Sequence, residues 1–257
     1  MVVDNHVHVG WYTDGYHAPQ EVWHSLLAAG VDNIVVSSTS TCAELYKVVV
    51  REMRSLIKLG GDRIHPILWL TPKMMKCRYA LPYMLHSKVA WHGVKLHWEA
   101  HPEWARNKKL LNKALDVARQ LKLPMLLHTG EKVNCEAQRF ERIIADSPDI
   151  TFVLAHGRPI EQTISILNRF NNVYVDTAFM TESSLWQLVN HNLANKILFG
   201  SDTPINELFF HLISTSEYIA KQIEMVRHIC GSKANEILGR TVFARVTQET
   251  AESLERT

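Results

Sequence analysis

Short apolar runs alternate with longer amphipathic segments along most of the chain. The short runs are rich in valine, isoleucine and leucine, which is typical of buried strands, and the longer segments show the spacing of helices. Strands are therefore predicted at 2–9, 32–37, 64–70, 93–97, 124–128, 151–156, 173–177 and 196–199. Helices are predicted at 18–30, 41–59, 78–87, 102–121, 135–145, 159–170, 182–191, 205–229 and 233–238.

This alternation predicts an α/β fold, a single (β/α)8 TIM barrel. Eight strand-helix units in one barrel typically need about 250 residues, so the 257 residues suit one domain over residues 1–257. The predicted strands at 124–128, 151–156 and 196–199 are nearly continuous apolar runs, as expected of parallel strands that are buried on both faces. Each changes to polar residues only at its carboxyl end.

The composition narrows the kinds of partner. The chain has 28 basic and 26 acidic residues, a net charge of +2, and this balance does not favour binding to nucleic acid. No run reaches the roughly 18 apolar residues of a membrane span, and a first strand beginning at Val2 leaves no room for a signal peptide. The four cysteines form no C-x-x-C pair. We therefore expect a cytoplasmic protein that acts on a small-molecule substrate, and we leave open whether it forms a homo-oligomer.

Histidine, lysine and aspartate residues close several of the apolar runs. They are His6 and His8 in the first run, Lys95 and His97 in the fourth, His128 in the fifth, His156 in the sixth and Asp202 after the eighth. Because a barrel gathers the carboxyl ends of all its strands around one mouth, we expect these side chains to meet there. Residues two apart on a strand point to the same face, so His6 and His8 can bind one cation together.

The H-x-H pair is a weak signal by itself. With 14 histidines in 257 residues, chance alone gives about 0.8 such pairs in the chain. A lone histidine at a strand end is more often a hydrogen-bonded core residue than a ligand. The recurrence of such residues at the same end of several strands is what predicts a metal site.

These segments resemble the amidohydrolase superfamily, and more narrowly its amidohydrolase-related branch (amidohydrolase 2). The resemblance spans nearly the whole chain and is carried by residues 4–8, 93–97, 127–130, 155–157 and 197–204. It implies that His6, His8, His128 and Asp202 bind a divalent metal, most often zinc, and leave a position for water. Zinc lowers the pKa of bound water to about 7.

The resemblance also implies catalytic roles for Asp202 and His156. Asp202 would accept a proton from the water, and His156 would orient that water or stabilise the developing charge. Lys95 stands where binuclear members place a carboxylated lysine that bridges two metals. In that variant His128 and His156 would hold the second ion. The alternative is a plain Lys95 ammonium that pairs with Asp202 or binds a substrate carboxylate.

Loop residues after the strands set specificity in barrels of this kind. The substrate-binding candidates are Trp11, Trp98, Glu131 and Arg158. The guanidinium of Arg158 could bind a carboxylate through two hydrogen bonds. Its place before Pro159, at a predicted helix start, is equally compatible with a structural or solvated arginine.

Three enzymatic functions remain open from the sequence. The leading hypothesis is a metal-dependent hydrolase in which activated water attacks an ester, lactone or amide bond of a small organic acid. The alternatives are a decarboxylase of an aromatic or unsaturated acid and a TatD-type phosphoesterase, which the near-neutral charge balance disfavours. A scaffold or metal store is less favoured, because structural zinc sites usually have four protein ligands and no open position.

Overall fold

The computed structural model describes residues 1–132, 134–209 and 212–243, and a single sheet runs through it. Its strand order is β2-β1-β3-β4-β5-β6-β7-β8-β9, and every neighbouring pair is parallel except β1 and β2. The strands are β1 (Val3–Tyr12), β2 (Gly15–His17), β3 (Asn33–Ser38), β4 (Ile64–Trp69), β5 (Gly93–Leu96), β6 (Met125–His128), β7 (Phe152–Ala155), β8 (Val173–Asp176) and β9 (Ile197–Leu198).

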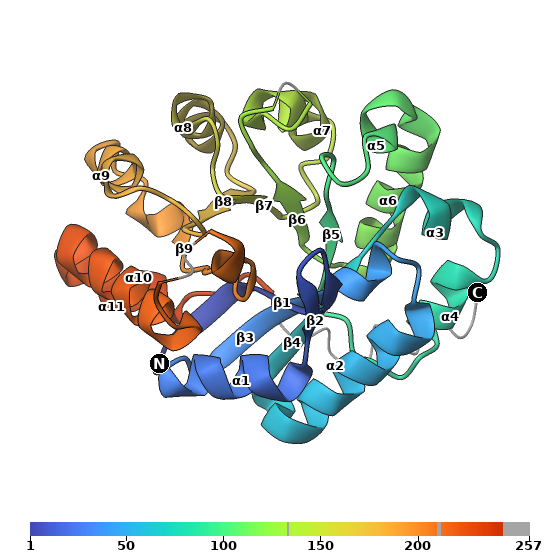
Figure 1. The fold of residues 1–257 in the computed structure, drawn as a ribbon. Helices are drawn as coiled ribbons and strands as arrows, with labels where there is room; N and C mark the ends of the chain where they lie inside the picture. Colours follow the sequence, from blue (N-terminus) through green and yellow to red (C-terminus); the bar gives the residue numbers. More distant parts are fainter. Residues whose placement is uncertain (133, 210–211, 244–257) are drawn as a thin grey trace.

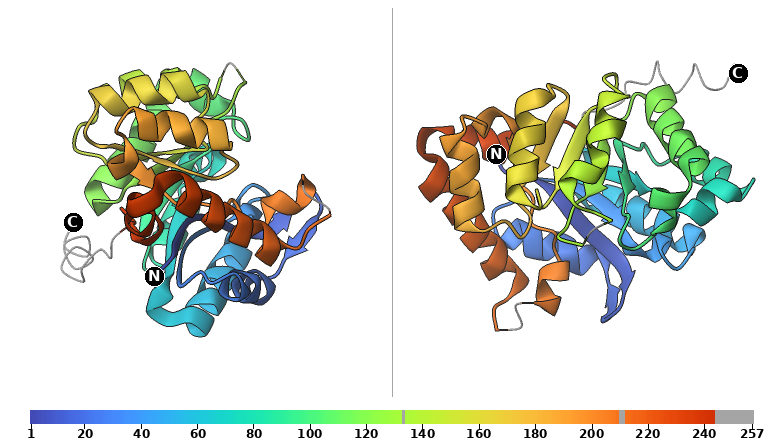
Figure 2. Two further views of the ribbon diagram at one scale, coloured as in Figure 1. Left: turned by 90° about the vertical axis from the view of Figure 1, so that its left-hand side faces the viewer. Right: turned by 90° about the horizontal axis from the view of Figure 1, so that it is seen from above.

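Hydrogen bonds bring the end of the sheet back to its beginning. The amide of Asn5 donates to the Phe199 carbonyl at 2.8 Å, and the amide of His8 donates to the Thr203 carbonyl at 2.7 Å. In Figures 1 and 2 the helices lie outside the strands. The result is a TIM-barrel-like α/β fold, in which the first and last parallel strands are side by side.

The helices follow the predicted alternation. They are α1 (Pro19–Ala28), α2 (Tyr46–Gly60), α3 (Pro72–Lys76), α4 (Ala80–Leu85), α5 (Glu103–Arg106), α6 (Lys108–Leu121), α7 (Glu141–Ala145), α8 (Ile160–Arg169), α9 (Glu182–Asn190), α10 (Thr215–Cys230) and α11 (Ala234–Gly239). Six 3₁₀ turns accompany them among the described residues: η1 (Thr39–Thr41), η2 (Gly61–Arg63), η3 (Ala137–Phe140), η4 (Ala194–Lys196), η5 (Ile205–Leu208) and η6 (Gly231–Lys233). No helix within the described ranges has the length and apolar character that crossing a bilayer requires.

Two predicted helices are divided by capping residues. Within the predicted 102–121 helix, Asn107 ends α5 and its side chain accepts the Leu110 amide at the start of α6. Within 205–229, η5 ends at Leu208, and Ser214 caps α10 by accepting the Glu217 amide. Asparagine and serine are favoured at N-caps because their side chains satisfy an amide that has no partner in the first turn.

The first strand is longer than predicted and continues into a hairpin. β1 runs to Tyr12 and turns back at Asp14 into β2, so that Trp11 faces Tyr16. Gly10 has a φ of 100°, which favours glycine, and a Cβ there would lie 2.4 Å from Ser40 Oγ. The hairpin therefore carries Trp11 and Tyr12 beyond the sheet edge.

The side chains of the strands divide between two hydrophobic clusters. The larger cluster lies between sheet and helices and takes alternate residues such as Ile34, Val94 and Leu127. The smaller cluster takes the residues between them: Val35, Ile67, Leu126, Val153, Ala155, Leu198 and, from the end of the described chain, Phe243. Because successive strand residues point to opposite faces, this second set lines the inside of the sheet.

Candidate metal and active site

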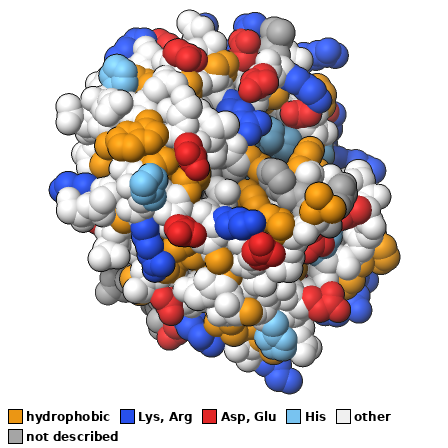
Figure 3. Space-filling model, turned by 60° about the vertical axis from the view of Figure 1, so that its left-hand side comes forward, with side chains coloured by type: hydrophobic (Ala, Val, Ile, Leu, Met, Phe, Trp, Pro, Cys, Tyr) orange, Lys and Arg blue, Asp and Glu red, His pale blue; other side chains and the backbone are white. Residues whose placement is uncertain are grey.

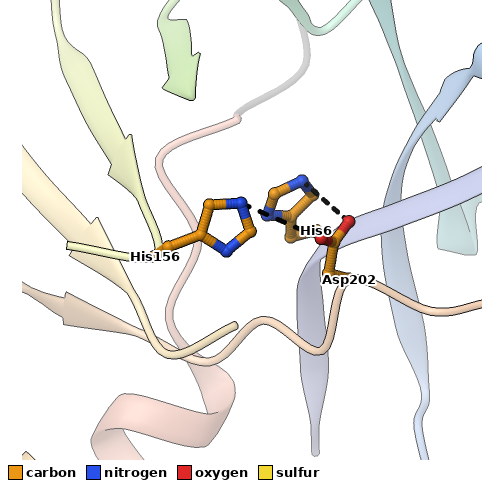
Figure 4. A group of neighbouring side chains, drawn as sticks. All are labelled: His6, His156 and Asp202. Carbon is orange, nitrogen blue, oxygen red and sulfur yellow. Dashed lines mark ion pairs between the residues drawn. The ribbon is translucent and has the colours of Figure 1, made fainter. Parts of the chain in front are cut away.

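Three predicted residues converge from three separate segments of the chain. His6 belongs to β1, His156 follows β7 and Asp202 follows β9. One ligand atom from each lies within 4.8 Å of the other two, and all three side chains are buried (Figure 4). The structure thus brings together residues that are up to 196 positions apart in the sequence.

His8 and Lys95 join this group on its β1 and β5 side. The Nε2 atoms of His6 and His8 are 3.2 Å apart, and Lys95 Nζ lies 2.9 Å from each of them. Oδ1 of Asp202 lies 3.0 Å from His8 Nε2 and 3.3 Å from His6 Nε2. Lys95 is fully buried, and the geometry is that of an ammonium among histidine nitrogens and a carboxylate.

His128 lies next to His156. Its Nδ1 is 3.2 Å from His156 Nε2, and its Nε2 is 3.6 Å from Oε2 of Glu99. Lys132 forms an ion pair with the other oxygen of Glu99. The His128 ring also stacks on His97 with 3.6 Å between ring centroids. The predicted ligands therefore form one continuous cluster, with His128 on the side away from His8.

The outer nitrogen of each imidazole is held by the protein. Nδ1 of His8 lies 2.9 Å from Ser37 Oγ, and Nδ1 of His156 lies 3.1 Å from the Ala178 carbonyl. Nδ1 of His6 lies 2.9 Å from Oδ2 of Asp176. Such contacts fix ring orientation in metal sites and leave the second nitrogen free for the metal. Here that second nitrogen, Nε2, points into the cluster in all three rings.

The sequence analysis did not identify Asp176. It closes β8 as His128 closes β6, so the same signal, a polar residue at the carboxyl end of an apolar run, could have found it. The side chain of Asp176 contacts the ring of the candidate ligand His6, and this contact is visible only in the structure.

Two site residues have an unusual backbone conformation. His156 has a φ of 68° and Asp202 a φ of 60°, in the left-handed region that non-glycine residues rarely adopt. The His156 amide donates to Asp176 Oδ1 at 2.9 Å, and the Asp202 amide donates to the His6 carbonyl at 2.8 Å. Strain of this kind persists only where the surroundings enforce it, and it is common at functional sites.

Burial keeps the imidazoles in the form that binds metal. The pKa of His6, His8 and His156 is lowered to about 3, mainly by burial and, for the first two, also by the nearby Lys95. Burial also lowers the pKa of Lys95 to about 8. Burial raises the pKa of Asp202, but its contacts with the histidines outweigh this and leave the pKa well below its ordinary value. Neutral imidazoles thus face an ionised carboxylate.

These residues fit a divalent cation. Oδ1 of Asp202 is buried and has no hydrogen bond of good geometry among the described residues, although two imidazole nitrogens lie close to it. An unsatisfied buried carboxylate oxygen is costly, and a cation between it and the nitrogens would remove that cost. Histidine nitrogens together with one carboxylate are ligands that zinc and similar metals accept.

The cluster lies at one wall of a cavity of about 970 Å³. Trp11, Glu131 and Arg158, three of the predicted substrate-binding residues, line it. The lining also includes the aromatic or thiol groups of Tyr12, Cys42, Trp69, Phe179 and Phe209, and the ion pair of Glu99 with Lys132. A separate cavity of about 360 Å³ behind Trp11 contains none of the candidate ligands.

Trp98 is not brought to the cavity. Its ring is buried and packs on Phe140 with 4.5 Å between centroids. The prediction that Trp98 contacts substrate took account of its place after a strand but not of the direction of its side chain, which points into the core. We therefore leave Trp98 out of the proposed substrate-binding residues.

Arg158 combines a structural role with a place in the cavity wall. Nη2 donates to the Phe179 carbonyl at 2.7 Å, and the backbone amide donates to Thr129 Oγ1 at 2.9 Å. One edge of the guanidinium is thus fixed by the protein. The two alternatives for Arg158, structural and substrate-binding, are compatible in this arrangement.

Charge on the surface is mixed. On the face shown in Figure 3, acidic and basic side chains are interspersed and do not gather into a patch of one sign. This agrees with the near balance of 28 basic and 26 acidic residues. A field that would attract a polyanion is not seen on this face.

The protein thus combines a TIM-barrel-like fold with a buried cluster of candidate metal ligands. A model of the family described as amidohydrolase matches residues 90–240, more than half of the chain. The chain belongs to this family, in the branch termed amidohydrolase 2, and is an enzyme of the amidohydrolase superfamily. The resemblance that the sequence motifs predicted is thereby confirmed.

Solved structures share the fold over almost their whole length. An uncharacterized TIM-barrel protein from Bordetella bronchiseptica has 18% identity and a TM-score of 0.66, with 99% of this chain and 98% of that chain covered. A probable 2-pyrone-4,6-dicarboxylic acid hydrolase from Acinetobacter baumannii, with citric acid bound, has 15% identity, coverages of 93% and 99%, and a TM-score of 0.62.

A third similar structure is named for a different reaction. The 5-carboxyvanillate decarboxylase from Sphingomonas paucimobilis has 10% identity, coverages of 93% and 99%, and a TM-score of 0.62. At such low identity the likeness shows the fold alone. The comparison with curated proteins found no match.

Proposed function

We propose that this enzyme is a metal-dependent hydrolase that cleaves an ester, lactone or amide bond of a small organic acid. The observation that carries the proposal is the convergence of buried, neutral imidazoles on the Asp202 carboxylate at the wall of a large cavity. Membership of the amidohydrolase family supports it. In this proposal the eight parallel strands form a (β/α)8 barrel, with the site at their carboxyl ends.

The proposed ligands of one divalent cation, zinc in the first instance, are His6, His8 and Asp202 together with one of the two imidazoles His128 and His156. The cation would polarise the carbonyl of the substrate and lower the pKa of a water molecule. A second cation would need Lys95 as a carbamate bridge. The contacts of Lys95 Nζ with two imidazole nitrogens at 2.9 Å favour the plain ammonium.

The side chains of the chain then perform the proton transfers. Asp202 accepts a proton from the attacking water while the oxygen of that water bonds to the carbonyl carbon. Asp202 then returns the proton to the leaving oxygen or nitrogen. His156, whose Nδ1 is held by the Ala178 carbonyl, orients the water or stabilises charge on the carbonyl oxygen. Arg158 binds the carboxylate of the acid, and Trp11 and Glu131 form the outer wall of the cavity.

Decarboxylation is the second candidate. Three cationic side chains line the cavity, and Lys132 is paired with Glu99. Lys95 and Arg158 could hold a carboxylate near the metal ligands. A protein of the same fold is named as a decarboxylase. A TatD-like protein also shares the fold, but the mixed charge on the face shown in Figure 3 offers no basic surface for a phosphodiester polyanion.

The proposal also includes a single domain, a cytoplasmic location and a small-molecule substrate. Residues 1–257 would act as a single domain, and strands from both halves of the described chain share one sheet. The cytoplasm would be the working compartment, which is compatible with the four cysteines, all described and all free thiols. The substrate would be a small molecule.

The test combines metal analysis with a screen of small lactones, esters, amides and carboxylic acids. We expect about one zinc per chain, turnover that a chelator abolishes and added zinc restores, and one oxygen of solvent water in the product. Released carbon dioxide without water consumption would replace hydrolysis by decarboxylation. Turnover that survives complete removal of metal would refute both.

A further inference from the structure

Asp176 connects two parts of the candidate site. Its fully buried carboxylate closes β8 and has three close neighbours. Oδ1 accepts the backbone amides of His156 at 2.9 Å and Ala178 at 3.0 Å, whereas Oδ2 lies 2.9 Å from Nδ1 of His6. One side chain therefore contacts an imidazole from β1 and the backbone after β7.

The two oxygens of Asp176 are not equivalent, and this determines the proton on His6. Backbone amides only donate, so the atom that faces His156 and Ala178 must be an acceptor. The atom left for His6 is the second oxygen, which in the ionised carboxylate also only accepts. Nδ1 of His6 must then carry the ring proton, and Nε2 has the free lone pair.

The far side of the His6 ring agrees with this assignment. Lys95 Nζ, an ammonium that only donates, lies 2.9 Å from His6 Nε2. A proton on Nε2 would oppose that donor. Asp202 Oδ1, an acceptor, lies farther from this nitrogen, at 3.3 Å. The closest neighbour on each side of the ring, Asp176 at Nδ1 and Lys95 at Nε2, thus favours the same tautomer.

The close approach of Asp176 to His6 depends on a glycine between them. A Cβ at Gly200 would lie 3.0 Å from the Cβ of His6 and 3.1 Å from the Cβ of Asp176. Both contacts are tighter than ordinary packing, so a side chain at this position would push the two residues apart. The sequence Gly200-Ser201-Asp202 thereby leaves space for the contact at the point where it supplies the candidate ligand.

We infer that Asp176 is a positioning residue that fixes His6 as the Nδ1-protonated tautomer and holds the His156 backbone in its left-handed conformation. It thereby directs the lone pair of His6 Nε2 toward the cation position. The last step rests on the proposed function, whereas the tautomer and the backbone contact do not.

The substitution Asp176→Asn tests the inference with almost no change in shape. The two backbone amides keep the asparagine oxygen on their side, so its NH₂ group faces Nδ1 of His6. That nitrogen must then accept, and the ring proton moves to Nε2. In the metal-free protein labelled with ¹⁵N-histidine, NMR should show His6 protonated at Nδ1 in the unsubstituted protein and at Nε2 in the variant.

The second measurement is the affinity for cobalt(II) or zinc alone, without substrate. Loss of a carboxylate that orients a metal-binding histidine typically weakens metal affinity 10- to 100-fold, and we expect a loss of that size. The matched control is Asp4→Asn. Asp4 is also a fully buried carboxylate, but its hydrogen bonds among the described residues come from Ser201 Oγ at 2.6 Å and from the backbone amides of Ser201 and His6 at 3.0 and 3.1 Å, rather than from an imidazole ring. Its substitution should leave the His6 tautomer unchanged.

Each outcome decides the inference. An Nε2-protonated His6 in the unsubstituted protein overturns it, and this spectrum is sufficient if the Asp176 variant does not fold. A folded Asp176→Asn variant that keeps the Nδ1 proton also overturns it, because a purely structural role would lower stability without moving the proton. If the unsubstituted protein binds no cation, the proposed function fails, and the tautomer result still decides the role of Asp176.

Discussion

The inner face of the sheet is apolar at the amino end of the strands and polar at the carboxyl end. Two positions along a strand separate the two regions. Toward the amino end the inward residues include Val35, Ile67, Leu126 and Tyr174, and two residues further along the same strands they are Ser37, Trp69, His128 and Asp176. The comparison shows that one pattern of alternation supplies both an apolar core and the candidate site. The apolar residues that stabilise the fold and the polar residues proposed for catalysis lie in adjacent layers inside the sheet.

The two regions also differ in what closes them. At the amino end, Phe243 packs against the apolar layer and lies so near the start of β5 that a Cβ on Gly93 would come within 2.6 Å of its ring. At the carboxyl end, a cavity remains, and its lining includes the hairpin residues Trp11 and Tyr12 together with Phe179 and Phe209. One end is filled by the chain itself, and the other is left for a ligand.

The largest expected effect separates chemistry from stability. Asp202→Asn keeps the shape of the side chain but cannot accept a proton, so we expect kcat to fall by about 10²- to 10⁴-fold. Because the amino-terminal layer is untouched, the fold should be retained, while loss of a buried carboxylate with a lowered pKa should reduce the midpoint of thermal unfolding. The control is Asp32→Asn, an exposed aspartate just before β3, which should leave kcat unchanged. Full activity of Asp202→Asn would contradict its role.

A substitution in the apolar layer should lower stability and leave the affinity for metal unchanged. Phe243→Ala removes a fully buried ring from the apolar layer and should lower the free energy of unfolding by about 3–5 kcal/mol, measured by denaturant titration. Zinc affinity of the folded fraction should stay near that of the unsubstituted protein. Phe243→Leu, which refills most of the space, should recover more than half of the loss. A stability change below about 1 kcal/mol for the alanine variant would mean that the ring does not support the core.

Acid should destabilise the metal-free protein, because the buried imidazoles of the polar region are neutral in the folded state. The pKa values of His6, His8 and His156 are lowered by burial to about 3, so below pH 6.5 the unfolded chain binds protons that the folded chain does not. Stability is therefore lost as pH falls from about 6.5 toward 4. Asp4, whose pKa burial raises to about 7, opposes this, because the folded state then binds the extra proton.

Denaturant midpoints measured with a chelator between pH 7.5 and 4 test this expectation. The midpoint should fall on acidification, because the imidazoles whose pKa burial lowers, which also include His97 and His128, outnumber the carboxyls whose pKa burial raises, Asp4 and Asp176. Asp4→Asn should make the fall steeper, because the opposing group is gone. A midpoint that rises on acidification would show that the imidazoles are not kept neutral.

The smallest expected effect lies at the open end. Trp11 lines the cavity and is half exposed, so truncation of its ring should cost about 1 kcal/mol of substrate binding, a rise in KM of roughly fivefold with kcat little changed. Trp186→Ala, a similarly exposed tryptophan of α9 outside the cavity lining, is the control and should change neither constant. Equal effects of the two substitutions would remove Trp11 from the site.

Much of the fold was predictable because strands and helices differ in the period of their apolar positions. All eight predicted parallel strands are present, each within a few residues of its predicted bounds. The hairpin at Asp14 and the divisions at Asn107 and Ser214 were missed, since they depend on turn and capping contacts that an average over apolar positions does not resolve.

The candidate site was also predictable in part. Residues at strand ends, such as His6, His156 and Asp202, were found because topology alone brings strand ends together. The direction of Trp98 and the contact of Asp176 with His6 were not, because they depend on the twist of particular strands and on which side chains fill the space between them.

The sequence by itself determined the alternation of elements, the family and the residue types available for chemistry, since these follow from local periodicity and from motifs. Only the tertiary structure decided which nitrogen of each imidazole points inward, which residues remain neutral, and that His128 lies beside His156. The physical reason is that tautomer, burial and pKa are properties of the surroundings of a side chain. Those surroundings come from strands that are far apart in the sequence.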